Sequence, residues 1–292
     1  AEVGIRDYKV TGVQTCALPI WLQTLDRRWI FLAMLLAVAL PQLLQVRVPE
    51  KPTALVRNVF RKIEELPEGS RVLISFDYSP SSEGELAPMA TALVRHCCEK
   101  RHRLVLMTLW PDGKPLVERA ISRIIQGEYA ALGLQPGRDY VNLGYRPGKE
   151  VVIKTIATSL RAEFPTDDAG INLDELPLTA EVTNLQDLDL LISISAGFPG
   201  LKEWVQYASS PLKLPLAVGA TAVQAPQAYP YIPRQLLGIL AAVKGAAEYE
   251  VALGERYPNL AVPEKQDAVR RMAPQRSEEH TSELQSPCNL VC

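Results

Sequence analysis

Short apolar runs alternate along the chain with longer segments in which apolar residues recur at helical spacing. The apolar runs predict strands at 71–76, 103–109, 140–143, 188–194 and 214–218. The other segments predict helices at 53–65, 85–100, 115–131, 149–160, 201–208 and 231–252. Strands that are apolar throughout and separated by helices are typical of a parallel sheet covered on both faces. The pattern therefore predicts an α/β fold, a three-layer αβα sandwich whose mostly parallel sheet has about five strands, Rossmann-like or flavodoxin-like.

The connection at 164–187, before the fourth predicted strand, is long and polar. Loops of this length inside a compact domain often serve as lids or partner surfaces. We therefore expect this segment to be either a lid or a surface for a partner.

The last predicted helix, 231–252, carries a face of small residues: Gly238, Ala241, Ala242, Gly245 and Ala246. Lys244 interrupts its apolar run, which argues against a membrane span. We interpret this face as one that packs on the sheet. Contact with a partner protomer or a membrane helix is the alternative.

An apolar segment with two arginines at its start precedes all these elements. Residues 29–40 are apolar without interruption, and 41–44 extend the segment toward the roughly 20 residues that a membrane span needs. Arg27 and Arg28 predict that its start lies in the cytoplasm and everything after it outside. We interpret 21–46 as a signal anchor. A signal peptide cleaved after 37–39 and a buried core helix are the alternatives.

Both ends of the chain resemble translated sequencing-adapter sequence. Residues 10–20 read VTGVQTCALPI, and 276–286 read RSEEHTSELQS. We interpret 1–20 and 276–292 as artefacts and exclude them from the fold. The predicted organisation is then an anchor at 21–46, a linker with an amphipathic helix at 47–70, an extracytoplasmic α/β domain at 71–255, and a tail at 256–275 that leads to a lost segment.

Composition narrows the classes of partner and cofactor. The 292 residues include 31 Lys and Arg against 33 Asp and Glu, so no basic surplus indicates nucleic-acid binding. Inside the predicted domain the cysteines are the neighbours Cys97 and Cys98, and no Cys/His spacing typical of zinc occurs. Neither GxxxxGK[ST] nor GxGxxG is present. We expect no cofactor, no metal site and no nucleic-acid partner.

Ligands of open α/β sheets bind beyond the carboxyl ends of the strands. The residues at those ends give the ligand-binding candidates Asp77, Glu83, Tyr145, Arg146, Ser195, Gly197, Gly200 and Thr221. Backbone N–H groups of 195–200 suit an anion, although Gly and Pro there also make tight turns. We expect the site where the first and fourth strands end, with the catalytic residues, if any, unknown.

The charged candidates each allow two interpretations. Asp77, Glu83 and Glu85 suit acid–base work or a cation, but Ser82 with Glu83 and Glu85 also suits a helix start. Arg146 and Lys149 suit an anion or lie solvated. His96 and His102 stand among arginines at 95, 101 and 103, and we interpret them as part of a solvated basic patch.

Several motifs together resemble an uncharacterised family of bacterial membrane-anchored proteins. They are FDYSPSSEGEL at 76–86, LGYRPG at 143–148, SAGFPG at 195–200, EWV at 203–205, TAVQAP at 221–226 and KGAAEYE at 244–250. The resemblance implies an N-terminal membrane helix, an exported α/β domain and a second membrane helix soon after the last motif. It implies no activity or catalytic residues, and this chain lacks that second helix before its adapter-like tail.

These observations favour a membrane-anchored extracytoplasmic α/β domain that binds a ligand or a protein partner in an envelope assembly. The alternative is a hydrolase or transferase that uses carboxylates at the carboxyl ends of the strands. Convergence of Asp77, Glu83 and Glu85 with Arg146 in one deep pocket would favour the enzyme. A shallow crevice, with Glu83 and Glu85 only capping a helix, would favour the binding domain.

Overall fold

The computed structural model describes residues 26–43 and 51–260, which belong to two compact units that divide after Pro49. The adapter-like ends, the tail beyond Leu260 and the segment 44–50 lie outside the described residues. The predicted artefacts and the predicted lost segment therefore stay predictions.

Helix α2, Arg27–Leu43, is the described part of the first unit and has 17 residues. Its large apolar side chains are exposed, with Trp29 at 64% and Phe31 at 69%. Within the described ranges, no helix is both long enough and apolar enough to cross a membrane. The predicted signal anchor at 21–46, with its insertion into a membrane, stays a prediction.

The second unit is built on one six-stranded parallel sheet, which confirms the predicted α/β fold. The strands are β1 (Arg71–Asp77), β2 (Arg103–Thr108), β3 (Tyr140–Tyr145), β4 (Leu190–Ser195), β5 (Leu216–Ala220) and β6 (Gly238–Ala241). Their order in the sheet is β3-β2-β1-β4-β5-β6, the order of the Rossmann fold. All five predicted strands form, and a sixth is present.

Strand β6 corrects the prediction of one helix over 231–252. Gly238–Ala241 pairs in parallel with β5, and helix α10 (Ala242–Arg256) begins only after it. A Cβ on Gly238 would lie 2.1 Å from the carbonyl oxygen of Leu55, so this glycine lets the strand approach the first turn of helix α3 (Ala54–Glu65). Gly245 and Ala246 are buried, and a Cβ on Gly245 would meet the backbone of Leu240, as expected for a face packed on its own sheet.

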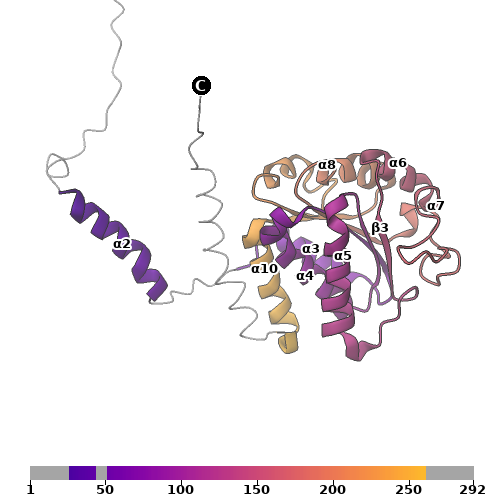
Figure 1. Cartoon of the computed structure of the whole chain (residues 1–292), viewed down its shortest axis with the longest axis horizontal. Helices are drawn as coiled ribbons and strands as arrows, with labels where there is room; N and C mark the ends of the chain where they lie inside the picture. Colours follow the sequence, from indigo (N-terminus) through magenta and orange to yellow (C-terminus); the bar gives the residue numbers. More distant parts are fainter. Residues whose placement is uncertain (1–25, 44–50, 261–292) are drawn as a thin grey trace, which may run out of the picture. The chain divides into compact units, whose positions relative to one another are not determined.

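Helices cover both faces of the sheet and make a three-layer sandwich (Figure 1). One face carries α3, α4 (Glu83–Glu99), α5 (Lys114–Ala120), the π-helical segment η3 (Ile121–Glu128) that continues α5, and α10. The other carries α6 (Glu150–Thr158), α7 (Leu160–Glu163), α8 (Leu201–Trp204), the π-helical η6 (Val205–Ser209) and α9 (Ser210–Leu212). Val56, Val59 and Ile63 of α3 are buried in the core, so this helix belongs to the α/β unit.

The segment KGAAEYE at 244–250 joins α10 to two neighbouring helices. The Thr53 N–H at the start of α3 donates a 2.8 Å hydrogen bond to Glu248. The Tyr249 hydroxyl lies 2.6 Å from Nδ1 of His96 on α4, and Glu250 lies 3.7 Å from Arg95. The motif therefore connects α10 to α3 and α4 on this face of the sheet.

His96 and His102 are buried, at 0% and 4% exposure, which corrects the prediction of a solvated basic patch. His96 Nε2 lies 3.1 Å from Glu64 Oε1 and donates to that carboxylate, while Nδ1 accepts from the Tyr249 hydroxyl. Burial lowers the pKa of His96 to about 4, although the hydrogen bond to Glu64 opposes the shift. Tyr249 and Glu64, which lie far from His96 in the sequence, account for its burial as a neutral side chain.

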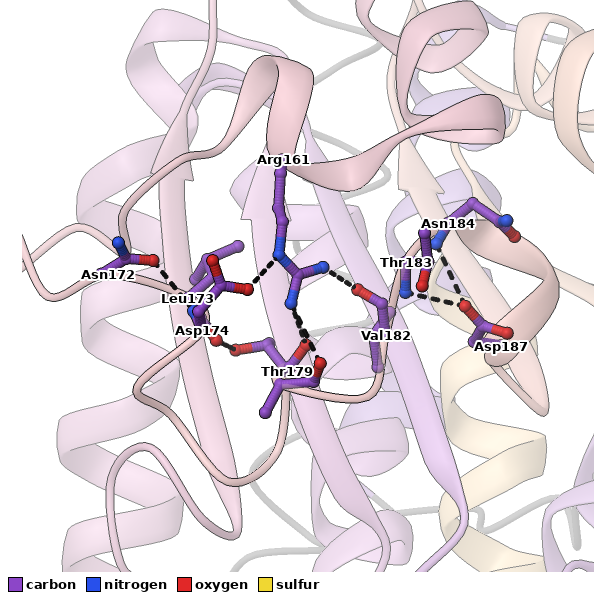
Figure 2. A network of polar contacts seen from close by, with 10 residues as sticks. Arg161, Asn172, Leu173, Asp174, Thr179, Val182, Thr183, Asn184 and Asp187 are labelled. Atoms are coloured by element: carbon purple, nitrogen blue, oxygen red, sulfur yellow. Dashed lines mark hydrogen bonds and ion pairs between the residues drawn. The ribbon is translucent and has the colours of Figure 1, made fainter.

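The long connection 164–187 is packed against the domain instead of standing out as a lid. Although Ile171 is exposed, six apolar side chains of the connection are buried: Phe164, Leu173, Leu176, Leu178, Val182 and Leu185. Figure 2 shows the Arg161 guanidinium at the centre of this segment, where it pairs with Asp174 and donates to the carbonyls of Thr179, Ala180 and Val182. These contacts tie the connection to α7.

Candidate functional site

The carboxyl ends of β1 and β4 lie side by side, as predicted. Strand β1 pairs with β2 on one side and with β4 on the other, and Asp77 stands opposite Ser195 in the register. The chain direction across the sheet reverses between these two strands, which is where ligands of doubly wound sheets bind. Asp77, Ser195, Gly197 and Gly200 therefore meet at one place.

The Asp77 carboxylate is fully buried there and is used by the fold. Oδ2 accepts from Ser75 Oγ at 2.7 Å and from the Trp204 indole N–H at 2.8 Å. Oδ1 accepts from the Leu109 N–H at 2.8 Å. Burial raises the pKa of Asp77 to about 6, against the opposing effect of these hydrogen bonds. The side chain joins β1, the loop after β2 and helix α8.

The loop after β2 lies over the loop after β4. The Trp110 indole N–H donates a 3.0 Å hydrogen bond to the carbonyl of Pro199. A Cβ on Gly197 would lie 3.2 Å from the Trp110 ring, so the tryptophan packs against this glycine. The two loops that were expected to frame a ligand are thus in contact with each other.

Polar groups of the 195–200 loop are likewise paired within the loop and the helix that follows. Ser195 Oγ accepts from the Leu201 N–H at 3.2 Å, and the Gly200 N–H donates to Glu203 Oε2 at 2.8 Å. A Cβ on Gly200 would lie 2.3 Å from the Gly197 carbonyl oxygen, so the turn needs glycine there. The geometry supports the interpretation as a tight turn.

The three candidate carboxylates point to different partners. Asp77 is held as described, Glu83 forms an ion pair with Arg119 of α5, and Glu85 accepts from the Ala222 N–H at 2.9 Å in the loop after β5. Glu83 and Glu85 lie in the first turn of α4, where acidic groups favour the helix dipole. The Ser82 side chain makes no capping hydrogen bond.

Tyr145 and Arg146 lie at the end of β3, separated from Asp77 by strand β2. The Arg146 guanidinium lies 5.0 Å from the Phe164 ring, and its buried Nε has no hydrogen-bond partner among the described residues. Lys149 reaches further along the edge, with Nζ 5.4 Å from the Phe198 ring. Arg146 therefore does not join the carboxylates in one pocket.

Thr221 follows β5 and is buried, and its carbonyl oxygen accepts from the Gln224 and Ala225 N–H groups at 3.1 and 2.9 Å. It begins a turn beside the end of β4. Ser195 thus ends β4 and Thr221 follows the neighbouring strand β5, while Glu83 pairs with Arg119 of α5.

Sequence reasoning missed a group of exposed apolar side chains in the loops and helix starts that follow β3, β4 and β5. We name them the carboxyl-end rim: Val151, Phe198, Val223 and Tyr229, exposed at 55%, 53%, 82% and 53%. Phe198 and Tyr229 stand beside prolines and Val151 opens a helix, so no shared pattern in the sequence marks the four as exposed. Only the topology gathers them at one edge of the sheet.

The part of the chain that the structure describes contains neither a group of metal ligands nor an accessible thiol. No three His, Cys, Asp or Glu side chains are grouped to hold a metal ion within residues 26–43 and 51–260. Cys97 and Cys98 are buried free thiols, and burial raises the pKa of both. Comparison of the chain with family models, curated proteins and solved structures found no match.

Proposed function

We propose that this chain is a membrane-tethered extracytoplasmic binding domain, and that its carboxyl-end rim docks a protein partner in the cell envelope. The observation that carries the proposal is that Val151, Phe198, Val223 and Tyr229 are all more than half exposed and stand in the segments that follow three parallel strands of the sheet. Clustered exposed apolar side chains mark interaction surfaces more often than single ones do. Lys149 lies beside Phe198 and adds a cation to this edge.

The loops beneath the rim support a docking role because contacts between them hold their shape. Trp110 bonds to the 195–200 loop, Trp204 bonds to Asp77, and Glu85 bonds to the loop after β5. A surface that is ordered before binding loses less conformational entropy when the partner docks. The same contacts occupy the carboxylates that the alternative, a hydrolase or transferase, would use.

Helix α2 supports the tether. It begins with Arg27 and Arg28, and its apolar side chains from Trp29 to Leu40 are largely exposed. A segment with arginines before an apolar helix orients with its start in the cytoplasm. The resemblance to membrane-anchored proteins favours the same topology, with the α/β domain outside.

Topology is tested by a reporter fused after Gly69, which follows α3 and precedes β1. Alkaline phosphatase at this position should be active in cells, because it folds only outside the cytoplasm. A fluorescent protein that folds only in the cytoplasm should stay dark there. The opposite pair of results would contradict the tether and the localisation.

Docking is tested with a photo-crosslinking amino acid placed singly at Val223 or Tyr229 in the full chain, in bacterial cells that produce it. We expect one discrete crosslinked protein, which is lost when Phe198 is changed to Ser. The matched control is Ile171, which is 44% exposed but lies in the 164–187 connection. Equal crosslinking from Ile171, or none from the rim, would contradict docking.

A further inference from the structure

A groove lies between helices α4 and α5–η3, on the sheet face opposite α6 and α8, and is separate from the carboxyl-end rim. Its volume is about 420 Å³, within the range of about 300–1,000 Å³ for small-molecule sites. One stripe of each helix forms a wall: Glu83, Ala87, Ala90, Thr91 and Arg95 of α4 face Leu116, Arg119, Ala120, Arg123, Ile124 and Glu128. Phe76 and Tyr78, at the end of β1 and just beyond it, complete the lining.

Small side chains keep the two helices from filling this space. Ala87 and Ala90 on α4 face Ala120 on α5, where larger residues would interdigitate. The far wall also changes from α-helical to π-helical hydrogen bonding, as the Tyr129 N–H donates to the Ile124 carbonyl five residues earlier, at 2.9 Å. Such π-helical turns occur frequently at functional sites.

The charges of the groove leave one arginine without a counterion. Arg119 pairs with Glu83 at one end, and Arg95 pairs with Glu128 at the other. Arg123 lies one helical turn beyond Arg119, is exposed to solvent, and makes no ion pair or hydrogen bond with another described residue. The lining residues thus include three arginines and two glutamates, and a third carboxylate, Glu250, lies outside the lining 3.7 Å from Arg95.

Tyr78 adds an unused donor to the groove. Its side chain is 2% exposed, and its hydroxyl makes no hydrogen bond within the described residues. Burial, with the nearby Glu83 carboxylate, raises the pKa of Tyr78, so the hydroxyl keeps its proton. The hydroxyl is not one of the fully buried polar atoms that lack a partner, so it is accessible from the groove and can donate to a ligand there.

We propose that this groove binds a small organic monoanion, a carboxylate with an apolar body. Arg123 neutralises the carboxylate, the Tyr78 hydroxyl donates to it, and Ala87, Ala90 and Ala120 contact the apolar body. A cation would meet three arginines against two glutamates of the lining, and a neutral ligand would gain no attraction from the Arg123 charge. This site is independent of the rim, so its failure would not bear on partner docking.

The test is isothermal titration of the full chain, held in lipid nanodiscs, with 3-phenylpropionate, and with empty nanodiscs as the blank. We expect a Kd of about 1 mM or tighter for this acid. Its amide and 3-phenylpropylamine, which share the apolar body but are neutral and cationic, should bind at least about tenfold more weakly. Equal binding of the three compounds, or no binding of the acid, would overturn the proposal.

Three variants locate the site. Arg123→Gln should weaken binding of the acid about tenfold or more, Tyr78→Phe severalfold, and Ala87→Leu should block it by filling the groove. Arg138→Gln is the matched control, because Arg138 is an exposed arginine outside the groove without an ion pair among the described residues. Circular dichroism and the thermal transition establish that each variant folds. Unchanged affinity in folded Arg123→Gln and Ala87→Leu would overturn the proposal.

Discussion

The indole N–H of Trp204 donates a 2.8 Å hydrogen bond to the Asp77 carboxylate across 127 positions of the sequence. This contact fastens helix α8 to the end of β1, at the point where the sheet changes direction. An acidic residue at this position of a Rossmann-like sheet invites a catalytic interpretation. Asp77 instead accepts three hydrogen bonds, from Ser75, Leu109 and Trp204, and so stabilises the fold.

Replacement of Asp77 by Asn should alter how stability depends on pH. Burial raises the folded-state pKa from 3.8 to about 6, so the folded chain holds the proton more tightly than the unfolded chain does. The resulting stabilisation is full below pH 3.8 and is lost as pH rises through 6, an effect of about 3 kcal/mol. In urea unfolding between pH 4 and 7, the free energy of unfolding of Asp77→Asn should rise relative to that of the wild type as pH increases, by about this amount. Parallel curves for the two proteins would contradict the shift.

Titration of His96 should change the free energy of unfolding in the opposite direction over nearly the same pH range. Its folded-state pKa is lowered from 6.5 to about 4, so the unfolded chain binds the proton more tightly. Its contribution to stability is present above pH 6.5 and is lost as pH falls through 4, again by about 3 kcal/mol. His96→Gln should therefore lose less stability on acidification than the wild type does.

The control for His96 is Tyr249→Phe, which removes the hydroxyl that Nδ1 accepts from but keeps the titrating ring. It should lower stability by about 1 kcal/mol at pH 7 and retain the acid-dependent loss. The difference between the two variants assigns the pH dependence to the ring. An acid profile in His96→Gln equal to that of the wild type would show that other groups cause it.

The strands were the most predictable part of the fold. Apolar residues run almost continuously through β1, β2, β4 and β5. Such runs are typical of strands in a sheet that is buried on both faces. β6 was missed because its four residues adjoin a helix and its own glycine and alanines suit either element. Its assignment depends on pairing with β5 and on the approach of Leu55 to Gly238, and neither has a local signal.

That the first and fourth strands end side by side was predictable, but the contacts made there were not. The rule for doubly wound sheets placed the candidate site between the first and fourth strands, and Asp77 stands opposite Ser195 there. The donors that occupy Asp77 come from Leu109 and Trp204, which nothing local in the sequence assigns to it. Burial of His96 was also missed, because its partners Tyr249 and Glu64 are distant in the sequence while the arginines beside it suggested an exposed side chain.

Two glycines of the 195–200 loop should respond differently to alanine. At Gly200 the new Cβ would lie 2.3 Å from the Gly197 carbonyl oxygen, which is backbone and cannot move without opening the turn. Gly200→Ala should lower the free energy of unfolding by about 1–3 kcal/mol. At Gly197 the Cβ would lie 3.2 Å from the Trp110 ring, a side chain that can shift slightly, so the loss should stay below about 1 kcal/mol. Denaturant titration ranks the two, and the reverse ranking would contradict the close backbone approach.

Arg161 should stabilise the 164–187 connection through carbonyl groups more than through its ion pair. Its guanidinium donates to the carbonyls of Val182, Thr179 and Ala180, whereas its partner Asp174 is 64% exposed. Arg161→Gln should therefore cost about 2–3 kcal/mol and speed proteolysis within 164–187, because hydrogen bonds from a charged donor are lost. Asp174→Asn should cost less than about 1 kcal/mol, as expected for an exposed ion pair. Equal losses in the two variants, by urea unfolding and limited proteolysis, would show that the ion pair and not the carbonyl contacts holds this segment.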